Sequence, residues 1–302
     1  MVQVHIAALE TDVPCYKVYT KRGLYSSQFR RLLQAAADRL NRSSHPLKNG
    51  QLDVRVTGFD VVGGEFPPLE SLRSDLASSK DTDRDIYTDP RLTPIDAILV
   101  TGAAAAAYDK LAWIPPLQSF LQTVYAQFPY VKIFGSCFGH QLIGQALLGA
   151  ESSETFSSRF PPLQRFSPTE PFCIQLIHGD AVVPYPQQQQ LHATGGKPTP
   201  TQSTEEGTLV APWMSIGSTD LCSVQGLYNP GRVLTLQGHF EFDAFATAEL
   251  CHQFANAFNW APSVLAAHLE RISRSARPDM QDDDDDSGAA AEAVLLFFAG
   301  ED

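Results

Sequence analysis

Basic residues are scarce in this chain of 302 residues, which has 22 lysines and arginines against 34 aspartates and glutamates. The formal net charge is −12, and five consecutive acids at 282–286 contribute to the excess. Nucleic acids and anionic membrane surfaces attract basic patches, so this composition argues against both as partners. Long apolar runs are lacking too, and a run such as 103–107 falls far short of a membrane span. We therefore predict no nucleic acid partner and no membrane association.

Cysteine is also uncommon, and no C-x-x-C pair occurs. The five cysteines are Cys15, Cys137, Cys173, Cys222 and Cys251. An odd, dispersed set argues against a disulfide framework and against a structural zinc site. Metal-ligand spacing, a P-loop and a G-x-G-x-x-G motif are missing as well, so we predict no cofactor and no metal. The apolar stretch at 1–10 is too short for a signal peptide. These features predict a cytoplasmic protein in a reducing compartment.

Apolar runs and helical periodicity alternate along the first half of the chain. Buried strands are predicted at residues 2–9, 52–62, 95–100 and 131–134. Helices are predicted at residues 29–41, 113–128 and 139–148, with a polar insertion at 70–94. Strands that alternate with helices indicate parallel β-α-β units. We therefore predict an α/β fold with a mostly parallel, doubly wound sheet flanked by helices.

The second half has a different pattern, with short apolar segments that predict a smaller antiparallel β portion. Short strands are predicted at residues 172–178, 209–216, 222–227 and 232–236. A loop is predicted at 185–207, and helices at 242–258 and 264–272. From about residue 273 the chain is acidic and then alanine-rich, which predicts a disordered tail with, at most, a short docked helix at 293–299. The resulting division is one domain over 1–262, followed by a C-terminal helix and tail over 263–302.

The segment 131–141 carries the strongest chemical signal. A short apolar strand runs directly into Gly135-Ser136-Cys137-Phe138-Gly139 and then into a helix, the arrangement of a nucleophile elbow with cysteine in place of serine. Small residues on either side of the nucleophile let strand and helix approach closely. The turn places the sulfur at a helix N-terminus, where the helix dipole favours the thiolate. Although most free cysteines are buried and inert, this context favours Cys137 as a nucleophile.

A thiol nucleophile needs a base, and the base needs an orienting partner. The segment 234–241 ends in His239-Phe240-Glu241. In an extended segment alternate side chains share a face, so the Glu241 carboxylate can hold the imidazole while its other nitrogen faces the sulfur. Taken alone, His239 would more often be a structural histidine. Together with the elbow it predicts a Cys137, His239 and Glu241 triad.

These motifs resemble those of a known family. The segment 135–141 resembles the G-x-C-x-G-x-Q motif of class I (triad) glutamine amidotransferases, and 237–241 resembles their Q-x-H-P-E motif. Segments 96–109 and 175–182 resemble the family's D-G-I-I-I-T-G-S…Y-D and H-x-D-x-V segments. Segment 59–67 resembles the stand-alone branch related to the GMP synthetase amidotransferase domain and to γ-glutamyl peptidases. The resemblance covers residues 1 to about 260 and implies a flavodoxin-like fold.

The resemblance also implies a reaction. The Cys137 thiolate would attack the side-chain amide of glutamine, form a γ-glutamyl thioester and release ammonia. His239 would protonate the ammonia and then activate water, which releases glutamate. Backbone amides near Gly102 and Ala103 and at Phe138 would form the oxyanion hole. Gln141 would bind the substrate.

Two departures from the family pattern affect geometry. Phe240 stands where the family has proline, and alanines at 103–107 stand where it has serine and proline. The proline is a backbone constraint and takes no part in the chemistry, so its absence does not remove the mechanism. The alanine-rich loop still offers backbone amides, but its contacts with a substrate are open.

Three functions remain open on the sequence. The leading prediction is a stand-alone glutamine amidotransferase-like enzyme that supplies ammonia to a separate synthetase or acceptor enzyme, in small-molecule or secondary-metabolite biosynthesis. The second is a γ-glutamyl peptidase or hydrolase that acts on γ-glutamyl conjugates with the same triad. The third is a non-catalytic regulatory module, which an intact Cys, His and Glu set argues against.

Overall fold

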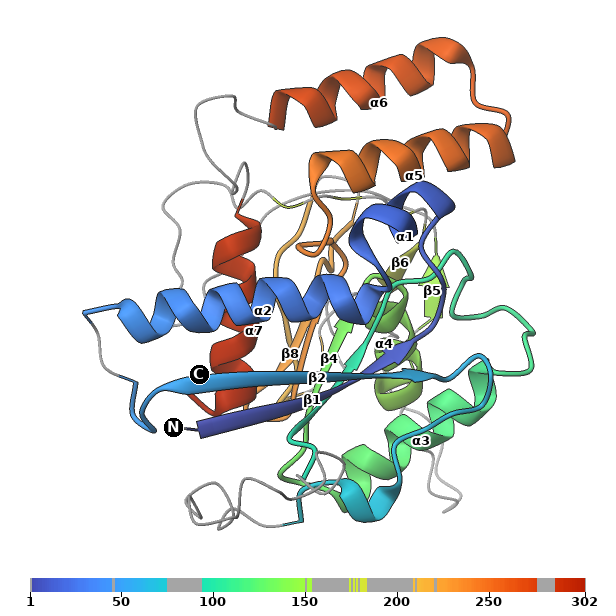
Figure 1. Ribbon diagram of the computed structural model, residues 1–302. Helices are drawn as coiled ribbons and strands as arrows, with labels where there is room; N and C mark the ends of the chain where they lie inside the picture. Colours follow the sequence, from blue (N-terminus) through green and yellow to red (C-terminus); the bar gives the residue numbers. More distant parts are fainter. Residues whose placement is uncertain are drawn as a thin grey trace, which may run out of the picture.

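The computed structural model places most of the chain in one α/β arrangement (Figure 1). It describes residues 2–44, 47–74, 94–149, 151–153, 174, 176, 178, 180–183, 209, 211–219, 222–275 and 286–301. The predicted loop at 185–207 and most of the predicted insertion at 70–94 lie outside these residues. Of the predicted strand at 172–178, only Ile174, Leu176 and His178 are described, and none of them is in a strand.

A seven-stranded sheet forms the centre of the described residues. Its order is β2-β1-β3-β4-β9-β8-β7. The strands are β1 (Val2–Glu10), β2 (Leu52–Asp60), β3 (Ala97–Val100), β4 (Lys132–Ser136), β7 (Met214–Ser215), β8 (Leu227–Asn229) and β9 (Val233–Leu236). The five strands from β2 to β9 are parallel, whereas β9, β8 and β7 pair antiparallel. The predicted fold class, with its antiparallel portion in the second half, is confirmed.

Helices cover both faces of this sheet (Figure 1). They are α1 (Tyr16–Arg22), α2 (Tyr25–Arg42), α3 (Ile114–Gln127), α4 (Phe138–Leu148), α5 (Ala244–Ala257), α6 (Pro262–Ser275) and α7 (Ser287–Ala299). Helices α2 and α7 pack on one face, and α3 and α4 on the other. Strand β1 shows the consequence, because Val4, Ile6 and Ala8 face one core while Ala7 and Leu9 face the other. Burial on both faces explains why the parallel strands read as continuous apolar runs.

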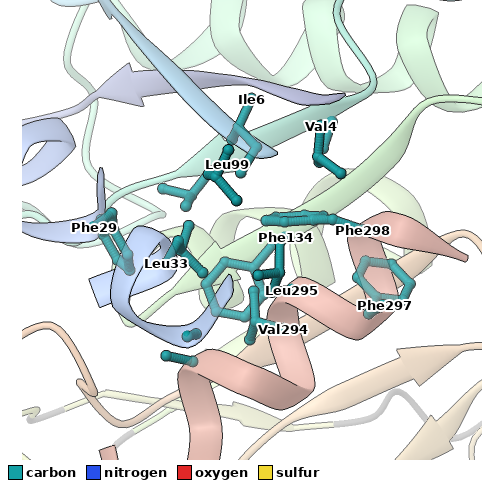
Figure 2. Packing of buried hydrophobic residues seen from close by; sticks show 14 of the residues in the cluster. Val4, Ile6, Phe29, Leu33, Leu99, Phe134, Val294, Leu295, Phe297 and Phe298 are labelled. Carbon is teal, nitrogen blue, oxygen red and sulfur yellow. The ribbon is translucent and has the colours of Figure 1, made fainter. Parts of the chain in front are cut away.

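The C-terminal helix α7 corrects the prediction of a disordered tail for residues 286–301. Its side chains Val294, Leu295, Phe297 and Phe298 are buried beside Phe134 (Figure 2). Glu292 of α7 pairs with Arg39 of α2 at 2.5 Å. The alanines at 289–291 and 293 give a narrow helix that packs closely on α2, a strong helix-forming signal that the acidic run before it obscured. The C-terminal segment therefore completes one face of the core.

Several short elements were missed by the sequence analysis. Helix α1 was not predicted, and the 3-10 turn η1 (Leu69–Ser71) overlaps the start of the predicted polar insertion. Strands β5 (Glu151–Ser153) and β6 (Ala181–Val183) form a separate antiparallel pair. Such two- and three-residue pairings depend on tertiary contacts and carry little periodic signal. Among the described helices none is both long and apolar enough to cross a membrane.

We expect Leu295→Ala to lower the free energy of unfolding by about 2–5 kcal/mol, because it leaves a cavity in the core beneath α7. Leu295 is fully buried, whereas Leu69 is 38% exposed and serves as the matched control. Leu69→Ala should cost less than about 1 kcal/mol. Denaturant unfolding of both variants measures the difference, and equal losses would argue against a core position for α7.

Candidate active site

Cys137 lies on a strained turn between β4 and α4. Its φ is 50° and its ψ −106°, in the positive-φ region that residues with a Cβ rarely adopt. A Cβ at Gly135 would lie 2.5 Å from the carbonyl carbon of Gly139, and a Cβ at Gly139 would lie 2.4 Å from the carbonyl oxygen of Val100. Only glycine fits at either position, as the elbow motif predicts. The sulfur is thereby held at the first turn of α4.

The carboxyl ends of three adjacent parallel strands meet at this turn. Val100 of β3 is paired with Gly135 of β4, and Ser136 is paired with Leu236 of β9. The amide of Cys137 donates a hydrogen bond of 2.9 Å to the carbonyl oxygen of Leu236. The residues that follow β3 and β9 in sequence therefore lie next to the cysteine. Carboxyl ends of strands in open α/β sheets are the usual position of ligand sites.

The three residues of the predicted triad are brought together at this edge. Nδ1 of His239 lies 2.7 Å from Oε1 of Glu241. The imidazole and Cys137 line the same small cavity. Oε1 of Glu241 accepts a second hydrogen bond, of 3.1 Å, from the hydroxyl of Ser136. All four side chains are buried. The arrangement brings together a thiol, an imidazole and a carboxylate, the three groups that cysteine-based acyl transfer uses as nucleophile, base and orienting partner.

The charges of this cluster favour protonation of His239. Burial alone would lower the pKa of the imidazole, but the charges of Glu241 and Cys137 and the hydrogen bonds to both side chains raise it to about 10. Because this pKa lies above neutrality, the imidazole is protonated at pH 7. The proton therefore lies on the imidazole, the group that would deliver it to a leaving amine in cysteine-based acyl transfer.

Aromatic side chains fix the segment that carries the histidine. Phe240 is 1% exposed and packs edge-on against Phe29 and Phe134, with ring centroids 5.3 and 5.8 Å apart. Phe242 stacks on the imidazole of His239 at 4.2 Å. Where the resembling family has a proline that stiffens the backbone, this chain anchors the same position by burying an aromatic side chain. His239 and Glu241 on either side of it then point together toward β4.

A small cavity of about 60 Å³ opens onto the sulfur and the imidazole. Gly102 and Ala103, predicted to help form an oxyanion hole, line it together with Cys137 and His239. The loop after β3 is held by the residue that directly follows β1, because the Thr11 hydroxyl donates to the Gly102 carbonyl at 2.9 Å. Phe138, the third predicted oxyanion residue, is the first residue of α4. The structure therefore gathers all three positions around the sulfur.

Gln141 occupies a different place from the one expected of a substrate ligand. It is 5% exposed, and its Nε2 donates to the carbonyl oxygen of Asp180 and to Oε1 of Gln237, both at 3.2 Å. Among the described residues that line the small cavity, Gln141 does not appear. Substrate binding by Gln141 stays a prediction.

Comparison with curated proteins gives two relatives. A Schizosaccharomyces pombe protein, provisionally named glutamine amidotransferase-like, is 25% identical over 248 residues, which cover 79% of this chain and 79% of that protein. A Saccharomyces cerevisiae protein, provisionally named a glutamine amidotransferase, is 27% identical over 202 residues, which cover 64% of each chain. This chain is a homologue of glutamine amidotransferase-like proteins.

Solved structures of glutamine amidotransferases are more distant. Those from Thermotoga maritima and Methylobacillus flagellatus are 12% and 13% identical to this chain, and each has a TM-score of 0.49. Both alignments cover 99% of this chain, with 97% and 95% of the other chains. No family model matches the sequence. The fold of this glutamine amidotransferase-like chain is therefore assigned from its own sheet order and helices.

Other residues of the site escaped the sequence analysis. Ser136 was noted only as part of the elbow, and Phe242 and Tyr25, which line the small cavity, were not singled out. His140 is fully buried and hydrogen-bonded to the Thr235 hydroxyl at 2.8 Å, and burial lowers its pKa to about 3. His140 is therefore a neutral structural link between α4 and β9. A polar or aromatic residue next to a motif gives no sign of its direction, so these roles required the structure.

We expect Glu241→Gln to lower the pKa of His239, because the carboxylate that favours the cation is lost while the opposing effect of burial remains. The wild-type value of about 10 lies above the ordinary 6.5, so the imidazolium persists through neutral pH and is lost as the pH rises through 10. In the variant this loss should occur at lower pH. NMR titration of the histidine ring protons measures it.

His239→Gln assigns the signal in that titration, and Ser136→Ala serves as a control that keeps both charges. The control should titrate close to the wild type. An identical titration of His239 in the wild type and in Glu241→Gln would contradict the assigned role of the carboxylate.

Proposed function

We propose that this glutamine amidotransferase-like chain is a cysteine-dependent amidohydrolase that cleaves the side-chain amide of glutamine. The observation that carries the proposal is the buried Cys137, His239 and Glu241 set at the carboxyl ends of β4 and β9. The two relatives, provisionally named for glutamine amidotransferase activity, support glutamine as the substrate. No other cluster in the described residues combines a strained cysteine with a hydrogen-bonded histidine and carboxylate.

In the proposed reaction the Cys137 thiolate attacks the carbonyl carbon of the glutamine side chain. Backbone amides near Gly102 and Ala103 and at Phe138 stabilise the oxyanion that develops. The imidazolium of His239 gives its proton to the nitrogen, and ammonia leaves as the C–N bond breaks. A γ-glutamyl thioester remains on the sulfur.

The second half of the proposed reaction restores the cysteine. His239, now neutral, removes a proton from water, and the resulting hydroxide attacks the thioester. Glutamate leaves, and the thiolate and imidazolium pair is regenerated. Glu241 holds the imidazole in one orientation through both steps. The ammonia is then available to a separate acceptor enzyme, which we place in small-molecule biosynthesis.

A second cavity favours γ-glutamyl conjugates as an alternative class of substrate. It has a volume of about 780 Å³ and shares Asp12 and Val13 with the small cavity, so the two cavities adjoin. Leu111 and Trp113 line it, together with the carboxylate-bearing Asp60 and Glu65. A cavity of this size can accept a substituent on the γ-nitrogen, and its acidic lining disfavours an anionic one.

We expect Cys137→Ala to abolish release of glutamate and ammonia from glutamine, with a loss of about 10⁴-fold or more, because no other group supplies the nucleophile. Cys222→Ser is the matched control, since Cys222 is also a buried cysteine but donates its S–H to the Val224 carbonyl. The control should keep nearly full activity. Equal activity in the wild type and Cys137→Ala would contradict the proposal.

The two substrate classes are separated by varying the group on the γ-nitrogen. If the larger cavity accepts the substituent on the γ-nitrogen, γ-glutamyl amides with neutral or cationic substituents should release glutamate faster than an anionic conjugate of similar size. Trp113→Ala should change the rate for the conjugates and leave the rate for glutamine within about twofold. Turnover of glutamine alone would exclude the hydrolase alternative.

A further inference from the structure

The sulfur of Cys137 has a neighbour that the triad does not include. Nε2 of Gln237 lies 3.6 Å from Sγ of Cys137, within hydrogen-bonding distance for sulfur. Gln237 directly follows β9 and is fully buried. Its backbone amide is bonded to the Gln225 carbonyl at 2.7 Å, which fixes the start of its side chain. An amide donor beside a sulfur stabilises the thiolate over the thiol.

The orientation of this amide follows from a chain of hydrogen bonds. The carbonyl oxygen of Asp180 can only accept, so the atom of Gln141 that lies 3.2 Å from it must be the NH₂ nitrogen. The same nitrogen has a second hydrogen, directed at Gln237 at 3.2 Å. The atom of Gln237 that receives it must be the oxygen. The NH₂ group of Gln237 therefore faces the sulfur, because the opposite orientation would place two NH₂ groups against each other.

We propose that Gln237 is a catalytic hydrogen-bond donor to the Cys137 thiolate and that Gln141 is the positioning residue that orients it. The geometry gives each glutamine a single compatible orientation, ending at a carbonyl oxygen on one side and at the sulfur on the other. This role deepens the proposed function, because it concerns the same thiolate. Gln141 then has a role different from substrate binding, because it orients the side-chain amide of Gln237.

The burial of Cys137 increases the effect of the Gln237 hydrogen bond on the sulfur. A charge removed from water must be compensated by partners inside the protein, and Cys137 is only 6% exposed. His239 approaches the sulfur as one charged partner, and Gln237 approaches it as a neutral donor. Because the amide has no charge to lose, its contribution persists at a pH where the imidazolium has been titrated.

The test is the pH dependence of Cys137 alkylation by iodoacetamide, which reports the thiolate and needs no glutaminase activity. For Gln237→Leu we expect the midpoint of this profile to move upward by about one to two pH units, and kcat for glutamine to fall about 10- to 100-fold with KM changed less than about threefold. Gln237→Glu, which keeps the shape and adds a negative charge, should react more slowly at neutral pH than Gln237→Leu.

This order of alkylation rates distinguishes a hydrogen-bond donor to the Cys137 sulfur from a residue that only packs against it. A packing role would make the isosteric Gln237→Glu the variant closest to the wild type. Gln28→Leu is the matched control, since Gln28 is a buried glutamine whose Nε2 donates to the Gly23 carbonyl. Its alkylation profile should be that of the wild type. Thermal melting of each variant checks that the fold is kept.

Gln141→Leu separates positioning from substrate binding. If Gln141 acts through Gln237, its loss moves the alkylation midpoint in the same direction by a smaller amount, and the double variant is no worse than Gln237→Leu alone. An unmoved profile in Gln237→Leu would overturn the inference, as would a Gln141→Leu variant that raises KM with its profile unmoved. A wild type without glutaminase activity whose alkylation still depends on Gln237 would reject the proposed function and keep the inference.

Discussion

Strand β4, helix α4 and strand β3 meet so closely that neither Gly135 nor Gly139 has room for a Cβ. This close approach forces the chain to reverse between them, and Cys137 takes the positive φ that the reversal needs. The strain is held in place by the sheet on one side and by a helix with a buried apolar face on the other. Because β3 and β9 flank β4, their carboxyl ends deliver Gly102 and His239 to the same sulfur.

Charge burial is the second demand on this edge of the sheet. Cys137, the protonated His239 and Glu241 lie together away from water, and a buried charge is stable only when it has partners. Ser136, Gln237 and the stacked ring of Phe242 surround the three groups, and Phe240 anchors the segment between histidine and glutamate in the core. The same low-dielectric setting that makes burial costly also strengthens each of these interactions.

The sequence was most informative where covalent geometry or burial on two faces leaves few alternatives. The buried strands β1, β3 and β4 were readable as apolar runs, and the elbow was readable because only glycine fits around Cys137. His239 and Glu241 could be paired because alternate residues of an extended segment share a face. For each of these positions, a local pattern determines the environment.

Where tertiary contacts decide, the sequence was less informative. Helix α7 follows an acidic run and is stabilised by packing against α2 and the sheet, which no local pattern reveals. Strands of two or three residues, such as β7 and β6, exist only through their partners. The direction of the Gln141 and Gln237 amides depends on Asp180, which is distant in sequence from both. Motif spacing identifies such residues, but only their hydrogen bonds indicate their roles.

In the proposed reaction, Cys137 carries the acyl group of the substrate. Rapid acid quenching of the protein with glutamine, followed by mass spectrometry of its peptides, tests this claim most directly. We expect a mass increase of one γ-glutamyl group on the peptide that contains Cys137, and hydroxylamine should remove this group because it cleaves thioesters. Rapid release of glutamate with the γ-glutamyl group found on another peptide would contradict this role of Cys137. An undiminished γ-glutamyl mass increase in Cys137→Ala would contradict it as well.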